Sequence, residues 1–170
     1  MQQSDLPKLF ALAWSNSRLG YDPSTQNGAI IVSVKDEISR GYNDLPRGYH
    51  HDFAARTDRE LKNAITGHAE RDAIYFSARG RYSTADATMI ALWAACPTCA
   101  EAIITSGIAR LFRLKWYTDN TPDRWRKSVE LGDEMLSRAG VDVIDWVGKF
   151  GEGYGPLRFD GKPVTPEMTW

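Results

Sequence analysis

Both cysteines of this chain fall within one short motif, Cys96-Pro97-Thr98-Cys99. A secreted disulfide scaffold would need more cysteines, so the chain must be held together by an apolar core. In a reducing compartment this spacing is typical of a metal site or of a redox pair. Two buried thiols without chemistry remain the alternative on spacing alone.

The bulk composition predicts an ordinary soluble globular protein. It has 170 residues, a formal net charge of −1, 42% hydrophobic and 25% charged residues. We expect a single domain over residues 1–170, with a core of about 5–146 and a tail, 147–170, without regular structure. Near-neutral charge makes nucleic acid an unlikely partner. No segment resembles a membrane span or a signal peptide, which predicts a cytoplasmic protein without a membrane partner.

The order of apolar and turn-forming segments predicts an α/β protein. Strands are expected at residues 28–34, 38–42, 88–94, 110–117 and 141–146, and helices at 6–19, 68–79, 97–106 and 123–139. Residues 43–64 form a long polar loop with a short helical piece near 57–62, which we expect to frame a site. Helices alternating with strands imply parallel crossovers, and hence a mixed five-stranded sheet with helices on both faces.

Three candidate metal ligands stand at predicted helix starts. His68-Ala69-Glu70 begins one helix and Cys96-Pro97-Thr98-Cys99 begins another. One imidazole and two thiolates leave a fourth position of Zn²⁺ open for water, as in catalytic sites. Glu70, two residues from His68, is the expected catalytic proton carrier. H-x-E with P-C-x-x-C is the signature of zinc nucleobase deaminases, from which this chain departs only by Ala95 in place of proline.

Two other interpretations of these residues stay open. A redox pair at Cys96 and Cys99 leaves His68 and Glu70 unexplained. A closed structural zinc site needs a fourth ligand, for which only His50 and His51 remain besides carboxylates. A non-catalytic zinc-binding module is the corresponding functional alternative.

Four stretches resemble the deoxycytidylate (dCMP) deaminase family. Residues 22–29, 41–48, 68–74 and 96–104 occur in the order seen in that family, and the resemblance covers about residues 5–146. It implies a three-layer α/β/α cytidine-deaminase-like fold. It also implies hydrolysis of dCMP, or a 5-substituted dCMP, to dUMP and ammonia, and a homo-oligomer, as a hexamer or a dimer. Other substrates in view are free cytidine, a riboflavin precursor and tRNA adenosine.

The resemblance also implies substrate contacts. Asn43 would bind the sugar hydroxyl, Ser24 and Gln26 would lie near the phosphate, and the main chain at Ala69 would meet the base. On sequence alone, Asn43, Ser24 and Gln26 are equally suited to forming turns.

Arginines and aromatic residues supply further candidates. Arg47, Arg56 and Arg59 belong to the long loop, where an arginine can bind a phosphate through two parallel hydrogen bonds, although a solvated side chain is the simpler expectation for each. Core or subunit contacts are expected for Trp93, Trp116 and Trp125. A pocket wall is the alternative for Trp116 and Tyr117.

Two departures from the resemblance carry predictions. Asp44 stands where many relatives have glycine, and a carboxylate there would repel a triphosphate, so we expect no regulation by dCTP or dTTP. No cysteine remains for a second, structural zinc, so we expect one Zn²⁺ per chain.

Overall fold

The computed structural model describes residues 1–36, 38–49 and 57–170, and it is built on one mixed sheet. Its strands, in the spatial order β2-β1-β3-β4-β5, are β2 Ile38–Tyr42, β1 Gly28–Val32, β3 Thr88–Ala91, β4 Arg110–Leu114 and β5 Asp142–Trp146. β1 pairs antiparallel with β2 and β3, whereas β3, β4 and β5 run parallel. The expected five-stranded mixed sheet is confirmed.

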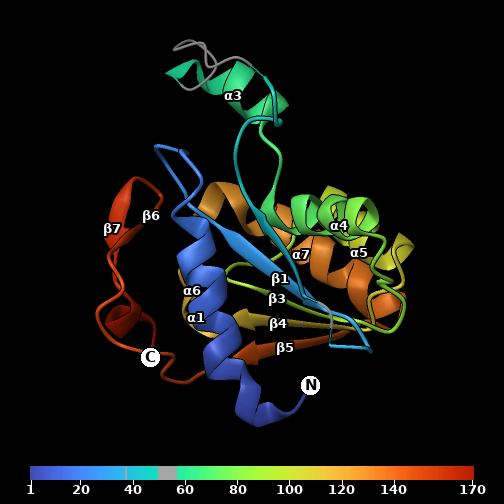
Figure 1. Ribbon diagram of the computed structural model, residues 1–170. Helices are drawn as coiled ribbons and strands as arrows, with labels where there is room; N and C mark the ends of the chain where they lie inside the picture. Colours follow the sequence, from blue (N-terminus) through green and yellow to red (C-terminus); the bar gives the residue numbers. More distant parts are fainter. Residues whose placement is uncertain (37, 50–56) are drawn as a thin grey trace.

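Helices cover both faces of this sheet (Figure 1). α1 Leu6–Ser17 lies on one face, while α4 Ala69–Gly80, α5 Pro97–Thr105 and α7 Asp123–Arg138 lie on the other. Alternate residues of the central strands point to opposite faces, so Ile30 packs with α1 and Ile31 packs with α4. The expected three-layer α/β/α architecture is therefore observed.

The chain path brings two helix starts to the same sheet edge. α5 follows β3 and leads into the parallel strand β4, so it begins at the carboxyl end of β3. α4 precedes β3 and runs back along it, so its first residues lie near that same end. The sequence elements predicted to carry chemistry, residues 68–70 and 96–99, are thereby placed together.

Small residues let α4 approach the sheet closely. A Cβ atom on Gly41 would lie 2.1 Å from the Ala69 carbonyl oxygen and 2.3 Å from the Ala73 nitrogen. The Ser39 hydroxyl donates a hydrogen bond to the Ala73 carbonyl. The position of α4 thus depends on the absence of a side chain at Gly41.

Three predicted strands end earlier than expected: β1 at Val32, β3 at Ala91 and, with the largest consequence, β4. Residues 110–117 were expected to be extended, but β4 ends at Leu114 and the short helix α6 Lys115–Asp119 follows. The last register pair between β4 and β5 joins Leu114 to Trp146, so no strand partner continues beyond it. The chain turns into a helix whose Tyr117 is fully buried.

The C-terminal tail was expected to lack regular structure, and this expectation is wrong. The tail forms a hairpin of β6 Leu157–Phe159 and β7 Lys162–Val164, followed by the 3-10 helix η2 Pro166–Thr169. Phe150, Leu157, Phe159 and Val164 join the core cluster on the α1 face. The tail was expected to be irregular because it is rich in Gly and Pro, and the spacing of these apolar residues was overlooked.

Two further elements complete the described chain: the 3-10 helix η1 Gln3–Asp5 before α1, and α3 Arg59–Ile65, which stands out from the body of the molecule (Figure 1). No helix within the described ranges combines the length and the apolar character needed to cross a bilayer.

Candidate metal centre and active site

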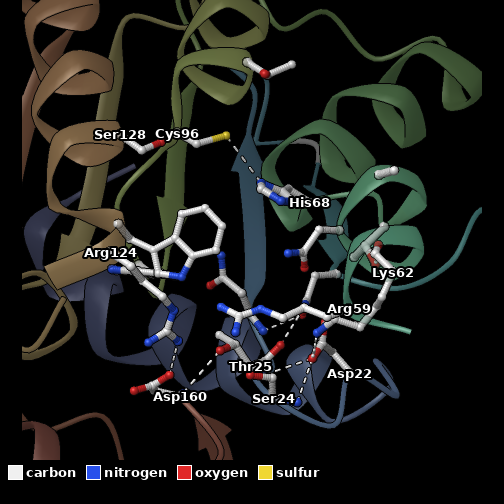
Figure 2. A pocket seen from close by; sticks show the side chains of 18 of the residues that line it. Asp22, Ser24, Thr25, Arg59, Lys62, His68, Cys96, Arg124, Ser128 and Asp160 are labelled. Carbon is white, nitrogen blue, oxygen red and sulfur yellow. Dashed lines mark hydrogen bonds and ion pairs between the residues drawn. The ribbon is translucent and has the colours of Figure 1, made fainter. Parts of the chain in front are cut away.

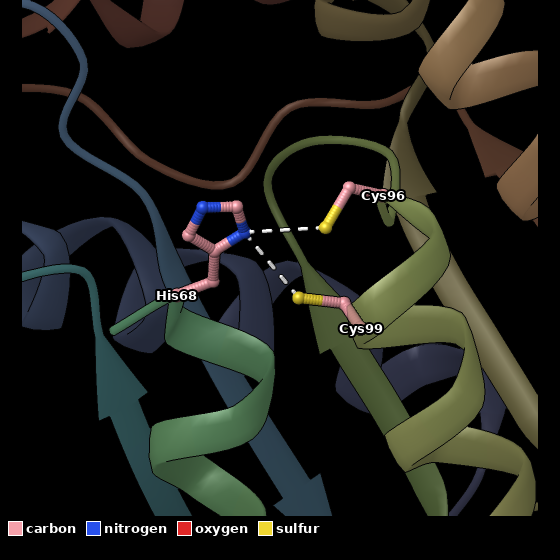
Figure 3. A group of neighbouring side chains, drawn as sticks. All are labelled: His68, Cys96 and Cys99. Carbon is pink, nitrogen blue, oxygen red and sulfur yellow. Dashed lines mark hydrogen bonds between the residues drawn. The ribbon is translucent and has the colours of Figure 1, made fainter. Parts of the chain in front are cut away.

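The side chains of His68, Cys96 and Cys99 converge on one point (Figure 3). One donor atom from each lies within 4.8 Å of the others. The His68 Nδ1 atom is 3.5 Å from Cys96 Sγ and 3.4 Å from Cys99 Sγ. An imidazole and two thiols this close form the nitrogen and sulfur donor set that Zn²⁺ prefers, so the residues present fit that metal.

Each ligand stands at a helix start. His68 is the N-cap of α4, Cys96 is the N-cap of α5, and Cys99 lies in the first turn of α5. Pro97 occupies the first helical position, where its missing N–H leaves no hydrogen bond unmade. The positive ends of the helix dipoles favour thiolates at these positions.

The two cysteines shift each other's pKa. The pKa of Cys96 is lowered to about 3, chiefly because Cys99 donates a hydrogen bond to it and also because His68 lies beside it. A thiolate at Cys96 is the form that binds a metal. The His68 pKa is raised mainly by its hydrogen bond with Cys96.

Glu70 is buried behind the cluster. Its carboxyl is only 2% exposed, and its Oε2 atom is 3.5 Å from Cys99 Sγ. Burial is the main cause that raises the pKa of this carboxyl, because a low-dielectric site disfavours the charged form. A carboxyl with a raised pKa beside a metal site is suited to accepting and returning a proton.

Ala95, the departure from the deaminase signature, is held by packing instead of by a proline ring. Ala95 is fully buried, and its carbonyl oxygen would lie 2.2 Å from a Cβ atom on Gly132 of α7. The loop before Cys96 is therefore fixed from outside by α7.

A cavity of about 890 Å³ opens over the metal cluster. Its described lining residues come from the loop after α1, the end of β2, α3, the starts of α4, α5 and α7, and the turn between β6 and β7. Figure 2 shows Cys96 at one end of it and Ser24, Asp22 and Asp160 at the other. The cavity therefore has a metal-binding end and an opposite, polar end.

Charged side chains gather at the polar end and on the flanks. The Lys and Arg residues that line the cavity, among those described, are Arg59, Lys62, Arg71 and Arg124. The Lys62 ammonium lies 3.0 Å from Asp22 Oδ1, and the Arg124 guanidinium pairs with Asp160. With two acidic and four basic groups, the described lining of the cavity has a net positive charge, although the formal net charge of the chain is −1. Such a cavity attracts an anionic ligand.

The structure brings three of the four sequence-predicted substrate residues to this site. Asn43 and Ser24 line the cavity, and Ala69 is buried beside His68 at the start of α4. The Asn43 amide accepts a hydrogen bond from Asn27 N (2.5 Å) and donates one to Thr25 O (2.6 Å). Asn43 thus shapes the cavity wall and still has one N–H and one lone pair for a ligand.

Gln26 is not brought to the cavity lining. Its side chain donates to the Gly20 carbonyl at 3.0 Å and accepts from Arg158 N at 3.1 Å. Both the nitrogen and the oxygen of the side-chain amide are therefore hydrogen-bonded to backbone groups. Gln26 thus fixes the loop instead of facing a phosphate.

The loop arginines have different positions. Arg59 lines the cavity, whereas Arg47 lies 3.4 Å from Asp72 on the surface beside it. Arg56 lies outside the described residues, as do His50 and His51, the candidate fourth ligands of a structural zinc site.

The aromatic residues also divide. Trp93 and Trp125 line the cavity, whereas Trp116 packs against the core on the α1 face and Tyr117 is buried there. The alternative that Trp116 and Tyr117 wall the pocket is therefore wrong, because the chain turns into α6 after Leu114 and carries them into that core.

Sequence reasoning missed the contributions of Lys62, Arg124, Trp125 and Asp160. Lys62 belongs to the loop that was expected to frame a site, but no signal singled it out. Arg124 and Trp125 open the amphipathic helix α7, where core or subunit contacts were expected for Trp125, and Asp160 lies in the tail. Only the three-dimensional path of the chain brings these residues to the cavity.

The family comparison decides the identity of this site. The family model of the cytidine and deoxycytidylate deaminase zinc-binding region matches residues 3–115, a span that contains all three candidate ligands. The chain belongs to this family. The expected enzyme class, a hydrolytic deaminase, and the expected Zn²⁺ cofactor are confirmed with it.

Named relatives agree with this assignment. The chain is 36% identical over 125 residues to a protein of Aliivibrio fischeri named "Uncharacterized deaminase in luxG 3'region", covering 72% of this chain and 80% of that one. It is 38% identical over 118 residues to the deoxycytidylate deaminase of enterobacteria phage T4, covering 69% of this chain. The match spans 56% of the phage protein, so the chain corresponds to about half of that relative.

Solved structures show the same fold. A dCMP deaminase of the cyanophage S-TIM5 in apo form superposes with a TM-score of 0.68 at 20% identity, covering 86% of this chain and 100% of the other. The same phage enzyme in complex with dCMP and dUMP gives a TM-score of 0.65 at 21% identity, covering 86% of this chain and 99% of the other.

Proposed function

We propose that this deaminase hydrolyses the 4-amino group of dCMP, or of a 5-substituted dCMP, to yield dUMP and ammonia. The observation that carries the proposal is the cavity itself. His68 and Cys96 of the metal cluster line one end, with Cys99 and Glu70 buried beside them, and basic side chains lie toward the other end. Support also comes from relatives named deoxycytidylate deaminase.

His68, Cys96 and Cys99 would hold Zn²⁺, one per chain. When bound by three protein ligands, zinc supplies Lewis-acid activation of the water that the hydrolysis consumes. The Glu70 carboxyl lies beside the cluster, with Oε2 3.5 Å from Cys99 Sγ, and its burial keeps it away from bulk water.

Glu70 would move the protons. Water adds across the C4=N3 double bond of cytosine, with one of its protons going to N3. The C4–N4 bond then breaks as the proton of the new C4 hydroxyl passes to the exocyclic amine, which leaves as ammonia and leaves a carbonyl at C4. The Glu70 carboxylate can accept each of these protons and pass it on, so its charge is restored after each turnover. The reaction needs no other reactant than water.

The rest of the cavity would position the nucleotide. Trp93 and Trp125 offer apolar surface to an aromatic base. The main chain at Ala69, which is buried next to His68 at the start of α4, would meet the base. Asn43 would meet the sugar hydroxyl, and Ser24 at the polar end would meet the phosphate. The positive balance of the cavity lining favours a nucleotide over an uncharged nucleoside.

A panel of substrates tests the proposal on protein purified with a measured zinc content. Candidates are dCMP, 5-methyl-dCMP, deoxycytidine, cytidine, a riboflavin-pathway aminopyrimidine and a tRNA anticodon hairpin. We expect the highest kcat/KM for dCMP or its 5-methyl derivative. Faster turnover of another substrate would replace the dCMP assignment, and zinc-loaded protein that deaminates none of them would refute the enzymatic proposal.

We further propose that the chain forms a homo-oligomer. Tyr75 and Phe76 on α4 and Leu131 on α7 are large apolar side chains that are exposed in the isolated chain. Light scattering coupled to size-exclusion chromatography would test this, and a monomer at micromolar concentration would contradict it.

A further inference from the structure

The turn between β6 and β7 supplies part of the end wall of the cavity, opposite the metal cluster, through Asp160. The turn contains Asp160 and Gly161, both at positive φ (53° and 77°), as in tight two-residue hairpins. Asp160 lines the cavity and stands at the end farthest from Cys96 (Figure 2). This hairpin lies outside the segment that the family model matches, residues 3–115.

Four hydrogen bonds join the hairpin to the loop after α1. Gly161 N donates to Ser24 O at 2.7 Å, and Asp160 N donates to Thr25 Oγ1 at 3.3 Å. Gln26 N donates to Arg158 O at 2.8 Å, and Arg158 N donates to Gln26 Oε1 at 3.1 Å. The end wall is thus tied along its length to the same loop that carries Ser24.

An ion pair connects the same turn to α7. The Asp160 carboxylate accepts a hydrogen bond from the Arg124 guanidinium in the first turn of α7. A guanidinium has five N–H donors, so contact with one carboxylate leaves others for a second anion. Arg124 is therefore held at the cavity end with donors left over.

The end wall contains one group that attracts anions and one that repels them. Arg124 offers positive charge to an anion that reaches the polar end, whereas the Asp160 carboxylate lies behind it in the turn. Arg124 lowers the pKa of Asp160, so this carboxylate stays ionised at neutral pH. One phosphate can bind the guanidinium, but a longer phosphate chain would meet a carboxylate and the backbone of the turn.

We propose that the β6–β7 turn limits substrate length, with Arg124 binding the single phosphate of a nucleoside monophosphate and Asp160 excluding nucleoside di- and triphosphates. The inference rests on the proposed deamination of a nucleotide and names the residues that select its phosphate number. Arg124 acts as a binding residue, and Asp160 acts as a positioning and excluding residue.

Asp160→Asn tests the excluding role with little change in shape. Asparagine tolerates positive φ and keeps an oxygen that accepts a hydrogen bond from Arg124, while the negative charge is removed. We expect the ratio of kcat/KM for dCDP or dCTP to that for dCMP to rise about tenfold or more, through a lower KM for the longer substrates.

Arg124→Gln tests the binding role. We expect KM for dCMP to rise by about tenfold or more with a small change in kcat, and kcat/KM for deoxycytidine, which lacks a phosphate, to stay within about twofold. The matched control is Arg126→Gln, which removes an arginine of the same helix that pairs with Asp123 at 2.7 Å outside the cavity lining. This control should leave all ratios unchanged.

The outcomes separate this inference from the proposed function. If the wild-type protein deaminates dCMP but Asp160→Asn leaves the substrate ratios unchanged, the length-limiting role is overturned and the function stands. If no nucleotide is deaminated, calorimetric binding of dCMP and dCTP to the zinc-loaded protein still measures the selection. Equal affinity for both ligands would then overturn the inference as well.

Discussion

Tyr117 is a residue whose polar atom is buried without compensation. Its ring packs edge-on against Phe159 at a centroid distance of 4.7 Å, and its hydroxyl has no hydrogen-bond partner in the described part of the chain. Burial raises the pKa of this phenol, so it stays neutral at any physiological pH. The ring stabilises the core, whereas the hydroxyl bears a desolvation cost.

Tyr117→Phe should therefore stabilise the protein. Removing an unpaired buried hydroxyl while keeping the ring should raise the free energy of unfolding by about 1 kcal/mol. Urea denaturation measures the change, with Tyr49→Phe, at an exposed tyrosine, as the control. A clear loss of stability would show that the hydroxyl has a partner, such as a buried water.

Glu70 is the residue on which turnover should depend most. Glu70→Gln keeps the size of the side chain but removes its ability to carry a proton, so kcat should fall at least about 100-fold while the zinc content is kept. Metal analysis and a dCMP assay measure the two effects separately. Glu101→Gln, on the exposed side of α5, is the control. Activity retained by Glu70→Gln would assign proton transfer to another group.

At the scale of elements, the metal site depends on how closely α4 lies against β2. His68 caps α4 and both cysteines belong to the start of α5, so the three donor atoms meet only if both helices hold their positions. The contact at Gly41 sets one of these positions. A shift of α4 would move His68 relative to both sulfur atoms.

Gly41→Ala should loosen this arrangement. The new methyl group would clash with the backbone of α4, which should cost about 1–3 kcal/mol of stability and weaken zinc binding. Thermal melting and competition with a chromophoric chelator measure the two effects. Gly67→Ala is the control, because Gly67 directly precedes His68 but has room for a methyl group. A Cβ atom on Gly67 would lie 3.5 Å from the nearest heavy atom. Equal effects at both glycines would contradict the close-packing argument.

At the scale of the whole molecule, the tail is part of the core. Phe159 of β6 contacts Trp93 at a centroid distance of 5.0 Å as well as Tyr117, so the hairpin at the cavity end is anchored by the α1-face cluster. Loss of this anchor would affect both stability and the shape of the cavity.

Phe159→Ala should cost about 3–5 kcal/mol, as expected for emptying a buried aromatic site. It should also make the hairpin more sensitive to proteolysis than the rest of the chain. Denaturation and limited proteolysis followed by mass spectrometry measure both effects. Met168→Ala, at a half-exposed side chain of η2, should change stability by less than about 0.5 kcal/mol. A Phe159 variant as stable as this control would contradict the anchoring role.

Local signals explain how much could be predicted from the sequence. His68, Glu70, Cys96 and Cys99 lie in short motifs at helix starts, and the alternation of elements places those starts at one sheet edge, so the metal cluster followed from the sequence. The strand that ends at Leu114 was overextended, because the absence of a pairing partner cannot be recognised locally.

The polar end of the cavity could be predicted only in part. The family resemblance pointed to Ser24, but Arg124 and Asp160 lie 100 and 136 residues further along the chain and carry no motif. Their association depends on the packing of Phe159 and its neighbours, and tertiary contacts of this kind cannot be seen in the sequence.

The two ends of the cavity are built from separate stretches of chain, so the two ends can change independently in protein engineering and in evolution. Mutations in the β6–β7 hairpin can change which molecules are accepted without touching the starts of α4 and α5, where the bond is broken. New substrates can therefore be sought by grafting or randomising the C-terminal hairpin, while the metal ligands and Glu70 stay unchanged.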